Sequence, residues 1–293
     1  RHGLLAHGLR PRKLMKINKA IIAAAGRGTR FLPVTKAYPK ELLPILNKPV
    51  IQVLIEELIG AGLTEIAVVH HAKSRALADY FAPNPSLKNF LRKNNKLEWL
   101  ESLEAIRGQV KKLVFIPQSP DLHYGTGSPL IAARDFIGAD SFAYLYGDDL
   151  IGEETVGTYL KSLIRTFVTK KVAAVVAVDR VAWPEVVHFG TIRFKDNNKP
   201  ERIVRIEEKL SEDTAPSNYV DFGRFILNPD VIGFIESLKP RASEELIFIE
   251  ALNEMAKNSA VLAKPISNAR WLTVGSPGKW LEANLAFQKL WKS

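Results

Sequence analysis

The stretch KAIIAAAGRGTRFLPVTKAYPKELLPILNKP, Lys19 to Pro49, indicates how the chain folds. It begins with a continuous apolar run, 20–25, that breaks at Gly26, a pattern typical of a buried strand ending in a tight turn. Gly26 and Gly28 allow positive φ and carry no Cβ, so successive backbone N–H groups can close around phosphate oxygens. Arg30 follows with a guanidinium that can bind two such oxygens. The stretch therefore predicts an anion-binding loop after the first strand.

Two common nucleotide motifs do not fit this loop. The Rossmann fingerprint needs a third glycine where Phe31 stands, and the Walker pattern G-x-x-x-x-G-K-[ST] does not occur in the stretch. The cations Lys36 and Lys40 favour a phosphate ligand. On loop chemistry alone, a plain glycine turn with a solvated cationic face stays open as the alternative.

The sequence that follows the loop predicts an α/β fold. A helix can begin at Pro49, and apolar residues continue to Leu58 before the buried strand pattern EIAVVH at 65–70. Such a unit is nearly always a right-handed parallel crossover, and its first loop lies at the carboxyl edge where open α/β sheets bind ligands. We expect a Rossmann-like twisted mixed sheet, mostly parallel in its first half, with helices on both faces and a smaller β-rich region after about Arg180.

Composition limits the class of protein. A chain of 293 residues with 46% hydrophobic residues can fill one large α/β domain or two small ones. The absence of cysteine excludes disulfides and thiolate chemistry and fits a reducing cytoplasm, and no apolar run approaches the roughly 20 residues that span a bilayer. Four basic residues before Met15 contribute to the net charge of +10, and the others are scattered. We expect a soluble cytoplasmic protein that binds neither nucleic acid nor membrane.

Two later segments carry polar groups at predicted strand ends. Gln118 follows the strand pattern at 113–116, and its amide can offer both a donor and an acceptor to a pyrimidine edge. Gly125 and Gly127 then form a second glycine turn before a helix that starts at Ser128. We expect this turn to lie against a nucleobase or ribose.

Asp148 and Asp149 follow the predicted strand at 142–146. A carboxylate at the carboxyl end of a central strand, beside a phosphate site, can hold Mg²⁺, which prefers oxygen ligands. We assign this role to Asp148. An exposed Asp-Asp turn is the alternative.

Helical periodicity predicts further helices at 74–81, 87–106, 154–167 and 278–291. We expect the apolar side chains of the second of these segments to pack it on the sheet. We also expect the adjacent pair His70 and His71 to be structural, on opposite faces of a strand. The apolar residues concerned in the second segment are Phe90, Leu91, Leu97, Trp99 and Leu100.

The motifs at 26–33, 35–37 and 39–44 resemble the sugar-nucleotide pyrophosphorylases, whose signature is G-x-G-T-R followed by P-K. Among these enzymes the chain looks most like the bacterial UTP–glucose-1-phosphate uridylyltransferases, and the agreement returns at 215–218 and 223–225. This resemblance implies a nucleotidyltransferase that makes UDP-glucose and pyrophosphate by in-line attack of glucose 1-phosphate on the α-phosphate of UTP. It also implies Mg²⁺ as cofactor and a homo-oligomer, dimer or tetramer, whose contact involves the closing helix.

The resemblance further implies the residues of the site. Arg30 and Lys40 would be catalytic, and Asp148 would bind the metal. Glutamine at position 118 would read the base, and the helical segment near 86–103 favours UTP over dTTP. The substrate-binding residues implied are Ala23, Ala24, Gly26, Gly28, Thr29, Glu41, Gln118, Gly127, Gly190, Glu208 and Lys209, of which Gly190 and Glu208 would contact sugar hydroxyls and Lys209 the sugar phosphate.

Several positions depart from the family pattern. Thr273 stands where relatives commonly have a second metal-binding aspartate, and Leu210 replaces the proline that usually follows the lysine. Ile247 and Ile249 replace polar residues after the acidic Glu244. A weakly active or non-catalytic relative that binds sugar nucleotides in a regulatory role is therefore one alternative, and a pyrophosphorylase for another base or sugar is a second.

The expected organisation is a single nucleotidyltransferase domain over 15–293. Residues 1–14 have neither the apolar core nor the cleavage site of a signal peptide, and we interpret them as a disordered leader or tag. Within the domain we expect a nucleotide-binding half at about 15–180 and a sugar-binding half at about 181–293.

Overall fold

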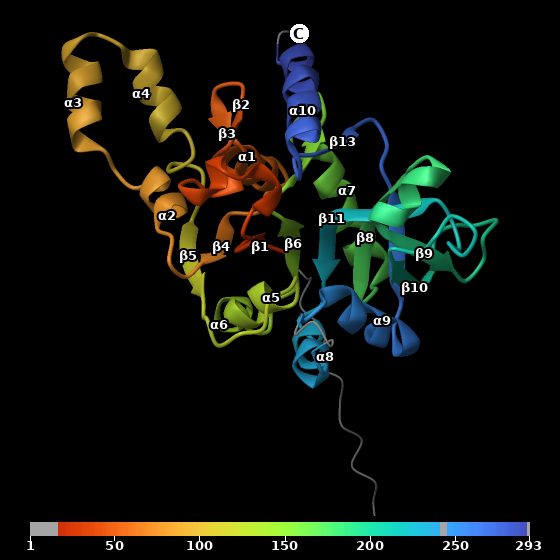
Figure 1. The fold of residues 1–293 in the computed structure, drawn as a ribbon. Coiled ribbons are helices and arrows are strands. Elements are labelled where there is room, and N and C mark those ends of the chain that lie inside the picture. The colour runs from red at the N-terminus through yellow and green to blue at the C-terminus, as the bar shows by residue number, and fades with distance from the viewer. Residues whose placement is uncertain (1–16, 241–244, 292–293) are drawn as a thin grey trace, which may run out of the picture.

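One large sheet runs through the protein in the computed structural model, which describes residues 17–240 and 245–291 (Figure 1). The expectations for residues 1–14 and for Glu244 concern positions outside these described residues. Within them the sheet has nine strands. The strands are β1 (Lys19–Ala24), β4 (Glu65–His71), β5 (Lys112–Gln118), β6 (Phe142–Tyr146), β8 (Ala174–Arg180), β9 (Gly190–Phe194), β10 (Ile203–Glu208), β11 (Tyr219–Leu227) and β12 (Val261–Pro265).

The order of the strands confirms the predicted mixed sheet. Strands run β10-β9-β11-β6-β1-β4-β5, while β8 pairs with β11 and with β12. Strand β1 is parallel to both β4 and β6, and β4 is parallel to β5. Strand β11 lies antiparallel to β6, β8 and β9, so the second half is mixed. The first half is parallel, as the crossover pattern predicts.

Helices cover both faces of the sheet. Successive residues of β1 point to opposite faces, and each face packs into its own hydrophobic core. Ala20, Ile22 and Ala24 belong to one core, and Ile21 belongs to the other. In Figure 1 the helices that pack on the first core lie above the sheet, and those that pack on the second core lie below it. The upper helices are α1 (Val50–Gly60), α7 (Thr158–Lys170) and α10 (Pro277–Leu290), and the lower ones are α5 (Ser128–Ala132), α6 (Arg134–Ile137), α8 (Val231–Ser237) and α9 (Phe248–Asn258).

A topological switch point lies at β1. From β1 the chain proceeds through α1 to β4 and β5 on one side, and it then returns to β6 on the other side. The loops after β1 and β6 consequently start side by side at the carboxyl edge, and the Gly147 N–H donates to the Ala23 carbonyl across 3.0 Å. Such an edge is where open α/β sheets bind ligands.

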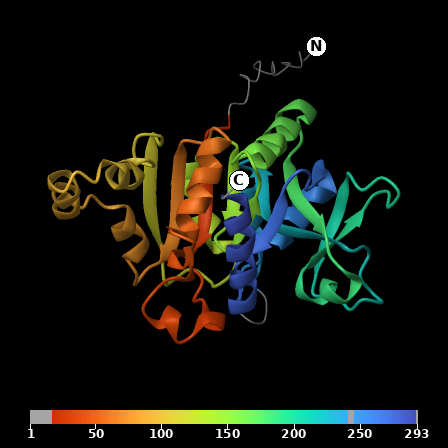
Figure 2. The ribbon, with the colours of Figure 1, turned by 90° about the horizontal axis from the view of Figure 1, so that it is seen from above.

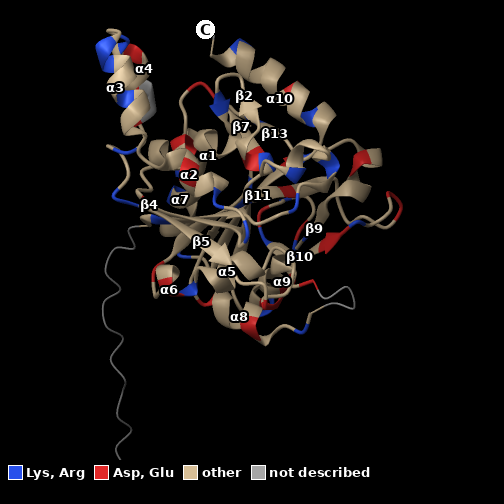
Figure 3. Ribbon diagram, turned by 60° about the vertical axis from the view of Figure 1, so that its left-hand side comes forward, with Lys and Arg blue, Asp and Glu red and all other residues tan. Residues whose placement is uncertain are grey.

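The prediction for residues 87–106 was wrong in two respects. The segment forms two helices, α3 (Pro85–Lys93) and α4 (Leu97–Glu104), that follow α2 (Ala76–Phe81) and project from the sheet (Figure 1). The break occurs because Asn95 takes a left-handed φ of 52°. Phe90, Leu97 and Trp99 are more than half exposed, so they do not pack on the sheet, whereas Leu91 and Leu100 are buried. Figure 3 shows basic residues on α3 and acidic residues on α4, and Lys88 binds Glu104 between them.

Other predicted bounds shift less. Helix α7 begins at Thr158 rather than at 154, because Gly157 has a φ of 84° and the Glu153 carboxylate accepts hydrogen bonds from the N–H groups of Gly157 and Tyr159. The predicted start of a helix at Ser128 is confirmed. In the described part of the chain, no helix has the length and apolar character needed to cross a membrane.

The C-terminal segment returns to the N-terminal half. A two-stranded sheet pairs β7 (Asp149–Gly152) with β13 (Arg270–Thr273), and a hairpin joins β2 (Pro44–Ile45) to β3 (Lys48–Pro49). Helix α10 follows β13, and its Trp280 Nε1–H donates to the Pro44 carbonyl across 2.9 Å. Figure 2 shows the dark blue closing helix beside the red and orange elements of the first sixty residues. The first sixty residues and the C-terminal helix therefore lie together at one edge of the sheet.

A buried ion pair joins three of these elements. Arg224 on β11 is fully buried, and its guanidinium donates to both Glu57 carboxylate oxygens of α1 at 3.0 and 2.9 Å. It also donates to the Asp149 carbonyl at the start of β7. Because both charges are buried and paired in a bidentate geometry, loss of one partner would leave an uncompensated buried charge. The pair thus fixes the position of the segment that carries Asp148.

Candidate active site

The loop after β1 is built as a tight turn. Gly28 has a φ of 61°, and a Cβ there would lie 2.9 Å from the Thr35 side chain. The Thr35 hydroxyl donates to the Gly28 carbonyl across 2.8 Å. Gly26, Thr29 and Arg30 are exposed on this loop, while Ala24 at the end of β1 is buried. The predicted glycine turn is therefore confirmed, with a positive φ at Gly28 but not at Gly26.

Four side chains converge beside this loop. Lys40 Nζ lies 2.5 Å from Asp148 Oδ2, and Arg30 Nη1 donates to the Gly275 carbonyl across 3.4 Å. A Cβ built on Gly275 would lie within 3.4 to 3.5 Å of Arg30 Nη1, Asp148 Oδ2 and Thr273 Oγ1, so these three atoms surround one small space. The structure thus brings together the two predicted catalytic cations and the predicted metal ligand.

The electrostatics favour charged forms for Lys40 and Asp148. Burial acts to lower the pKa of Lys40, but the carboxylates of Asp148 and Glu41 outweigh it, so the pKa lies above its ordinary value. Burial acts to raise the pKa of Asp148, but the attraction of Lys40 outweighs it and the pKa is lowered. Asp148 is therefore an ionised carboxylate at neutral pH.

Asp149 has a different environment. Its Oδ1 accepts a hydrogen bond of 2.7 Å from Trp271 Nε1, and the side chain is buried. Burial first, and then the charge of Asp148, raise the pKa of Asp149 to about 7. Of the two neighbours, Asp148 is thus the one that presents an ionised carboxylate to the loop after β1.

Glu41 lies beneath the cluster. It is fully buried, both of its carboxylate oxygens lack a hydrogen-bond partner in the described residues, and its Cγ lies 3.3 Å from where a Cβ of Gly147 would be. Burial raises the pKa of Glu41 to about 8. A carboxyl group that is fully enclosed in this way cannot reach a ligand without movement of the loop.

The donors at Asp148 suit a metal that arrives with phosphates. Among the described residues, no group of three or more His, Asp or Glu side chains is placed to hold a metal alone. One ionised carboxylate, with the Thr273 hydroxyl near it, matches the way Mg²⁺ is usually bound, by one or two carboxylates together with phosphate oxygens and water. The residues present therefore fit a Mg²⁺ ion shared with a nucleotide.

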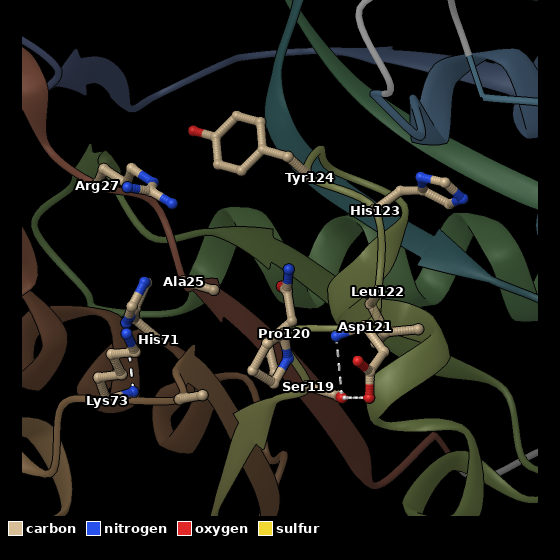
Figure 4. Close-up of a pocket in the computed structure, with 12 residues that line it drawn as sticks. Ala25, Arg27, His71, Lys73, Ser119, Pro120, Asp121, Leu122, His123 and Tyr124 are labelled. Carbon is tan, nitrogen blue, oxygen red and sulfur yellow. Dashed lines mark hydrogen bonds between the residues drawn. The ribbon is translucent and has the colours of Figure 1, made fainter.

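A cavity of about 680 Å³ opens beside the loop, between the ends of β1, β4 and β5 (Figure 4). Gln118 lines it, and the Gln118 Oε1 is buried without a hydrogen-bond partner in the described chain. This volume falls in the range of small-molecule sites. The cavity can thus take a nucleoside whose polar edge satisfies the Gln118 amide.

Two predictions about this cavity need correction or refinement. His70 is buried as expected, and His71 lines the cavity while its Nδ1 accepts a hydrogen bond of 3.3 Å from the Lys73 N–H. Gly127 is buried, and its N–H donates to the Leu246 carbonyl across 2.8 Å. In this structure Gly127 thus holds the second glycine turn against Leu246, and Tyr124 of the same turn lines the cavity.

A second group of predicted residues lies on neighbouring strands of the other half. Gly190 pairs directly with Glu208 across β9 and β10. Lys209 follows at a φ of 55°, is exposed, and its N–H donates to the Phe189 carbonyl across 3.0 Å. Phe189 packs edge-on against Trp271, whose indole binds Asp149. This contact connects the second group to the Asp148 strand end.

Sequence reasoning missed several residues of the site. Arg27 lies between the two loop glycines and lines the cavity, together with Lys73 and Tyr124 (Figure 4). The available signal was position, because Lys73 stands just beyond the carboxyl end of β4, at the ligand-binding edge. Asp221 on β11 was also missed, although it lies beside Gly190.

Comparisons with known proteins identify a family model, curated relatives and solved structures that match this chain. The family model described as nucleotidyl transferase matches residues 19–289. The UTP–glucose-1-phosphate uridylyltransferase of Bacillus subtilis (strain 168) is 34% identical over 282 residues, which cover 94% of this chain and 92% of that protein. A crystal structure of apo UDP-glucose pyrophosphorylase is similar with a TM-score of 0.86 at 32% identity, covering 94% of this chain and 99% of the other. A UDP-glucose pyrophosphorylase complexed with UDP-glucose gives a TM-score of 0.81 at 31% identity, with the same coverage.

Proposed function

Because the chain belongs to the nucleotidyl transferase family, we propose that it joins UTP and glucose 1-phosphate to form UDP-glucose and pyrophosphate. The relatives in the previous section carry this activity in their names, and they match nearly the whole chain. The observation that carries the proposal is the convergence of Arg30, Lys40 and Asp148 between the cavity of Gln118 and the strands of Gly190 and Glu208.

The reaction requires few groups beyond Arg30, Lys40 and Asp148. The phosphate of glucose 1-phosphate is already a nucleophile, so no general base is needed. The protein must align the two substrates for in-line attack. It must also neutralise the charge on the α-phosphate and on the leaving pyrophosphate. Arg30 and Lys40 bind the triphosphate oxygens, and Lys209 binds the phosphate of the sugar. Ala23, Gly26, Gly28 and Thr29 bring backbone and hydroxyl groups to the same phosphates.

In the free protein, Lys40 forms an ion pair with Asp148 in place of a substrate phosphate. Its ammonium is paired with Asp148 and is largely shielded from solvent. When a nucleotide enters, the phosphates can replace Asp148 as the partner of Lys40, which frees the carboxylate. The pairing thereby keeps both charges satisfied in the free protein and available in the complex.

We propose that Mg²⁺ is the divalent cation of this reaction and that Asp148 holds it. When bound by Asp148, the ion would neutralise phosphate charge. Because Thr273 stands in place of a second carboxylate, Asp148 and the phosphates would hold the ion together with water.

The nucleobase is read in the cavity. The Gln118 amide can accept from the N3–H of uracil and donate to a carbonyl of the same ring, which would satisfy the buried Oε1. Cytosine and adenine present a ring-nitrogen acceptor and an amino donor at the corresponding edge, which is the reverse of the uracil pattern. Thymine offers the same pattern, so preference for UTP over dTTP depends on the space around the ring.

We also propose that the chain assembles as a homo-oligomer. Leu281 and Leu285 lie one turn apart on α10 and are each 54% exposed, which gives the closing helix an apolar stripe toward solvent. An apolar stripe of this kind is typical of a helix that packs on a second chain.

The test is pyrophosphate release by the purified protein with Mg²⁺ and glucose 1-phosphate, with UTP, dTTP, CTP, ATP and GTP offered in parallel. Strong release with UTP and formation of UDP-glucose are expected. Absence of release with every nucleotide, while UTP or UDP-glucose still raises the melting temperature, would instead identify a binding protein without catalysis.

A further inference from the structure

Three neighbouring strands bring two carboxylates to one glycine. Glu208 on β10 stands opposite Gly190 on β9. On the other side Val220 of β11 stands opposite Thr191, and continuing this antiparallel register by one residue sets Asp221 opposite Gly190. Residues directly opposite each other in an antiparallel pair point to the same face. Glu208 and Asp221 therefore flank Gly190 on one face of the sheet.

The missing side chain of Gly190 leaves a notch between the two carboxylates. A Cβ built on Gly190 would lie 2.7 Å from Asp221 Oδ1 and 3.0 Å from the Ile206 side chain. A residue larger than glycine at this position would consequently collide with the Asp221 carboxylate. Glu208, Gly190 and Asp221 are each partly accessible to solvent, so a ligand can reach the notch.

The backbone of β11 aims Asp221 at this notch. The register of β11 against β8 shifts between Asp221 and Phe225, which marks a β-bulge. Within the bulge Gly223 has a φ of 71°, and a Cβ there would lie 2.6 Å from the ring of Tyr146. Bulges redirect side chains and are frequent beside active sites. Tyr146 precedes Asp148 by two residues, so the bulge packs directly on the strand of the reaction centre.

We propose that Asp221 is a sugar-specificity residue, whose carboxylate accepts a hydrogen bond from a glucose hydroxyl in the notch and, with Glu208, excludes sugar 1-phosphates that carry a second anionic group. This inference rests on the proposed function and adds a residue to its sugar site. Two neighbouring carboxylates are well suited to the hydroxyl donors of a neutral sugar. They repel the carboxylate of a uronic acid, which is a specificity by exclusion.

Asp221 also interacts with the backbone of Gly223, which is a structural role that the test must separate. Burial first, and then the charges of Glu208 and Asp149, raise the pKa of this carboxyl to about 7. Assays at pH 8 therefore keep the carboxylate ionised.

The experiment measures initial rates at pH 8 for wild type, Asp221→Asn and Asp179→Asn, with glucose 1-phosphate and UTP varied separately. Asp179 is the matched control, because it is a half-buried carboxyl on β8 that stands opposite Val220 rather than Gly190. Asp221→Asn should raise KM for glucose 1-phosphate about tenfold, as expected for a weakened hydrogen bond to a charged group. KM for UTP should stay within twofold, and Asp179→Asn should change neither value.

Two further measurements on the same proteins complete the test. Glucose 1-phosphates with one hydroxyl at a time replaced by fluorine, which cannot donate, should include one position that costs wild type about tenfold in kcat/KM and costs Asp221→Asn less than about threefold, because the amide oxygen of asparagine accepts only a weaker hydrogen bond. Glucuronic acid 1-phosphate should be a poor substrate for wild type and a roughly tenfold better one for the variant.

The outcomes are distinct. A parallel rise of both KM values in Asp221→Asn, or no rise in either, would overturn the proposal, as would a wild type that accepts glucuronic acid 1-phosphate as readily as glucose 1-phosphate. The last result needs no variant, so misfolding of Asp221→Asn cannot hide it. If the wild type makes no UDP-glucose at all, the failure lies with the proposed function instead.

Discussion

Lys40 and Asp148 are 108 residues apart in the sequence, yet their charged atoms lie 2.5 Å apart at the edge of the sheet. The sequence motifs predict each residue separately, because a cation after a glycine turn and a carboxylate after a central strand each suggest a chemistry. The contact between them depends on the parallel pairing of β1 with β6, which no local pattern reveals. Asp221 shows more clearly what local sequence patterns cannot predict, because its position depends on a bulge and on the registers of two strand pairs.

At the scale of single residues, we predict the effect of removing the Lys40 charge. Lys40→Ala should lower kcat by about 10² to 10³, as loss of one electrostatic stabiliser of a transition state commonly does. Lys209→Ala should do the same if Lys209 binds the sugar phosphate. Lys161→Ala is the control, since Lys161 is an exposed lysine of α7 with no role in the proposed site, and it should stay within threefold of wild type. Steady-state rates with UTP and glucose 1-phosphate measure this, and near-full turnover by Lys40→Ala would remove its assigned role.

The threonine at the metal site leads to a second prediction. The Thr273 hydroxyl already accepts a hydrogen bond from the Gly275 N–H and lies 3.4 Å from the Asp148 carbonyl. We expect Thr273→Asp to raise kcat by less than about tenfold, because one carboxylate with phosphates and water is enough for Mg²⁺. Thr273→Asn is the uncharged control. A gain of a hundredfold or more in Thr273→Asp alone would mean that the natural chain is an impaired enzyme.

The raised pKa of Asp221 predicts a dependence of stability on pH. Its pKa is about 7 in the folded protein against an ordinary value of 3.8 for an aspartate, so between about pH 4 and pH 7 the unfolded chain loses a proton that the folded chain retains. The free energy of unfolding should therefore fall as pH rises through this window and level off above it. Asp221→Asn should flatten the fall only in part, because burial also raises the pKa values of Asp149 and Glu41, which contribute to the same fall. Urea unfolding at a series of pH values measures this, with Asp135→Asn as the exposed control. An unchanged slope would contradict the assignment.

At the scale of elements, periodicity predicts the strands and helices of the central layers well. The apolar run of β1, the helix after Pro49 and the strand at 142–146 form where the patterns indicate. The arm of α3 and α4 was predicted incorrectly, because helical spacing gives a helix its apolar face but does not say what covers that face. The break between the two helices at Asn95 was also hard to predict from the sequence. Asparagine can adopt the left-handed conformation itself, so no glycine marks the position.

The buried pair of Arg224 and Glu57 permits a test at this scale. Arg224→Ala should lower the free energy of unfolding by about 3 to 5 kcal/mol, because it leaves the Glu57 carboxylate buried and unpaired between α1 and β11. Arg193→Ala is the control, because it breaks the exposed pair with Glu207 and should cost less than about 1 kcal/mol. Urea unfolding curves compare the two. Equal losses would show that the buried pair does not hold these elements together.

At the scale of the whole molecule, the fold class and the position of the ligand-binding edge could both be predicted from the crossover pattern. The return of α10 to the N-terminal half could not be predicted, because the contact of Trp280 with Pro44 spans 236 residues. That contact places the exposed stripe of Leu281 and Leu285 on the outer surface.

The proposed oligomer gives a prediction for the whole molecule. The double variant Leu281→Glu with Leu285→Glu should shift the protein toward the mass of one chain in sedimentation velocity, because charges at an apolar contact prevent association. The matched control places glutamate at Leu97 on the projecting arm, which is similarly exposed. If the double variant keeps the mass of the wild type while the arm variant dissociates, the contact lies on the arm and not on α10.

The measurement that tests the central claim most directly is formation of UDP-glucose from UTP and glucose 1-phosphate by wild type and by Asp148→Asn, followed by mass spectrometry of the products. Wild type should form equal amounts of UDP-glucose and pyrophosphate. Asp148→Asn should form them at least a hundredfold more slowly, while UTP still stabilises its fold. No UDP-glucose from wild type, or an undiminished rate in Asp148→Asn, would contradict the account.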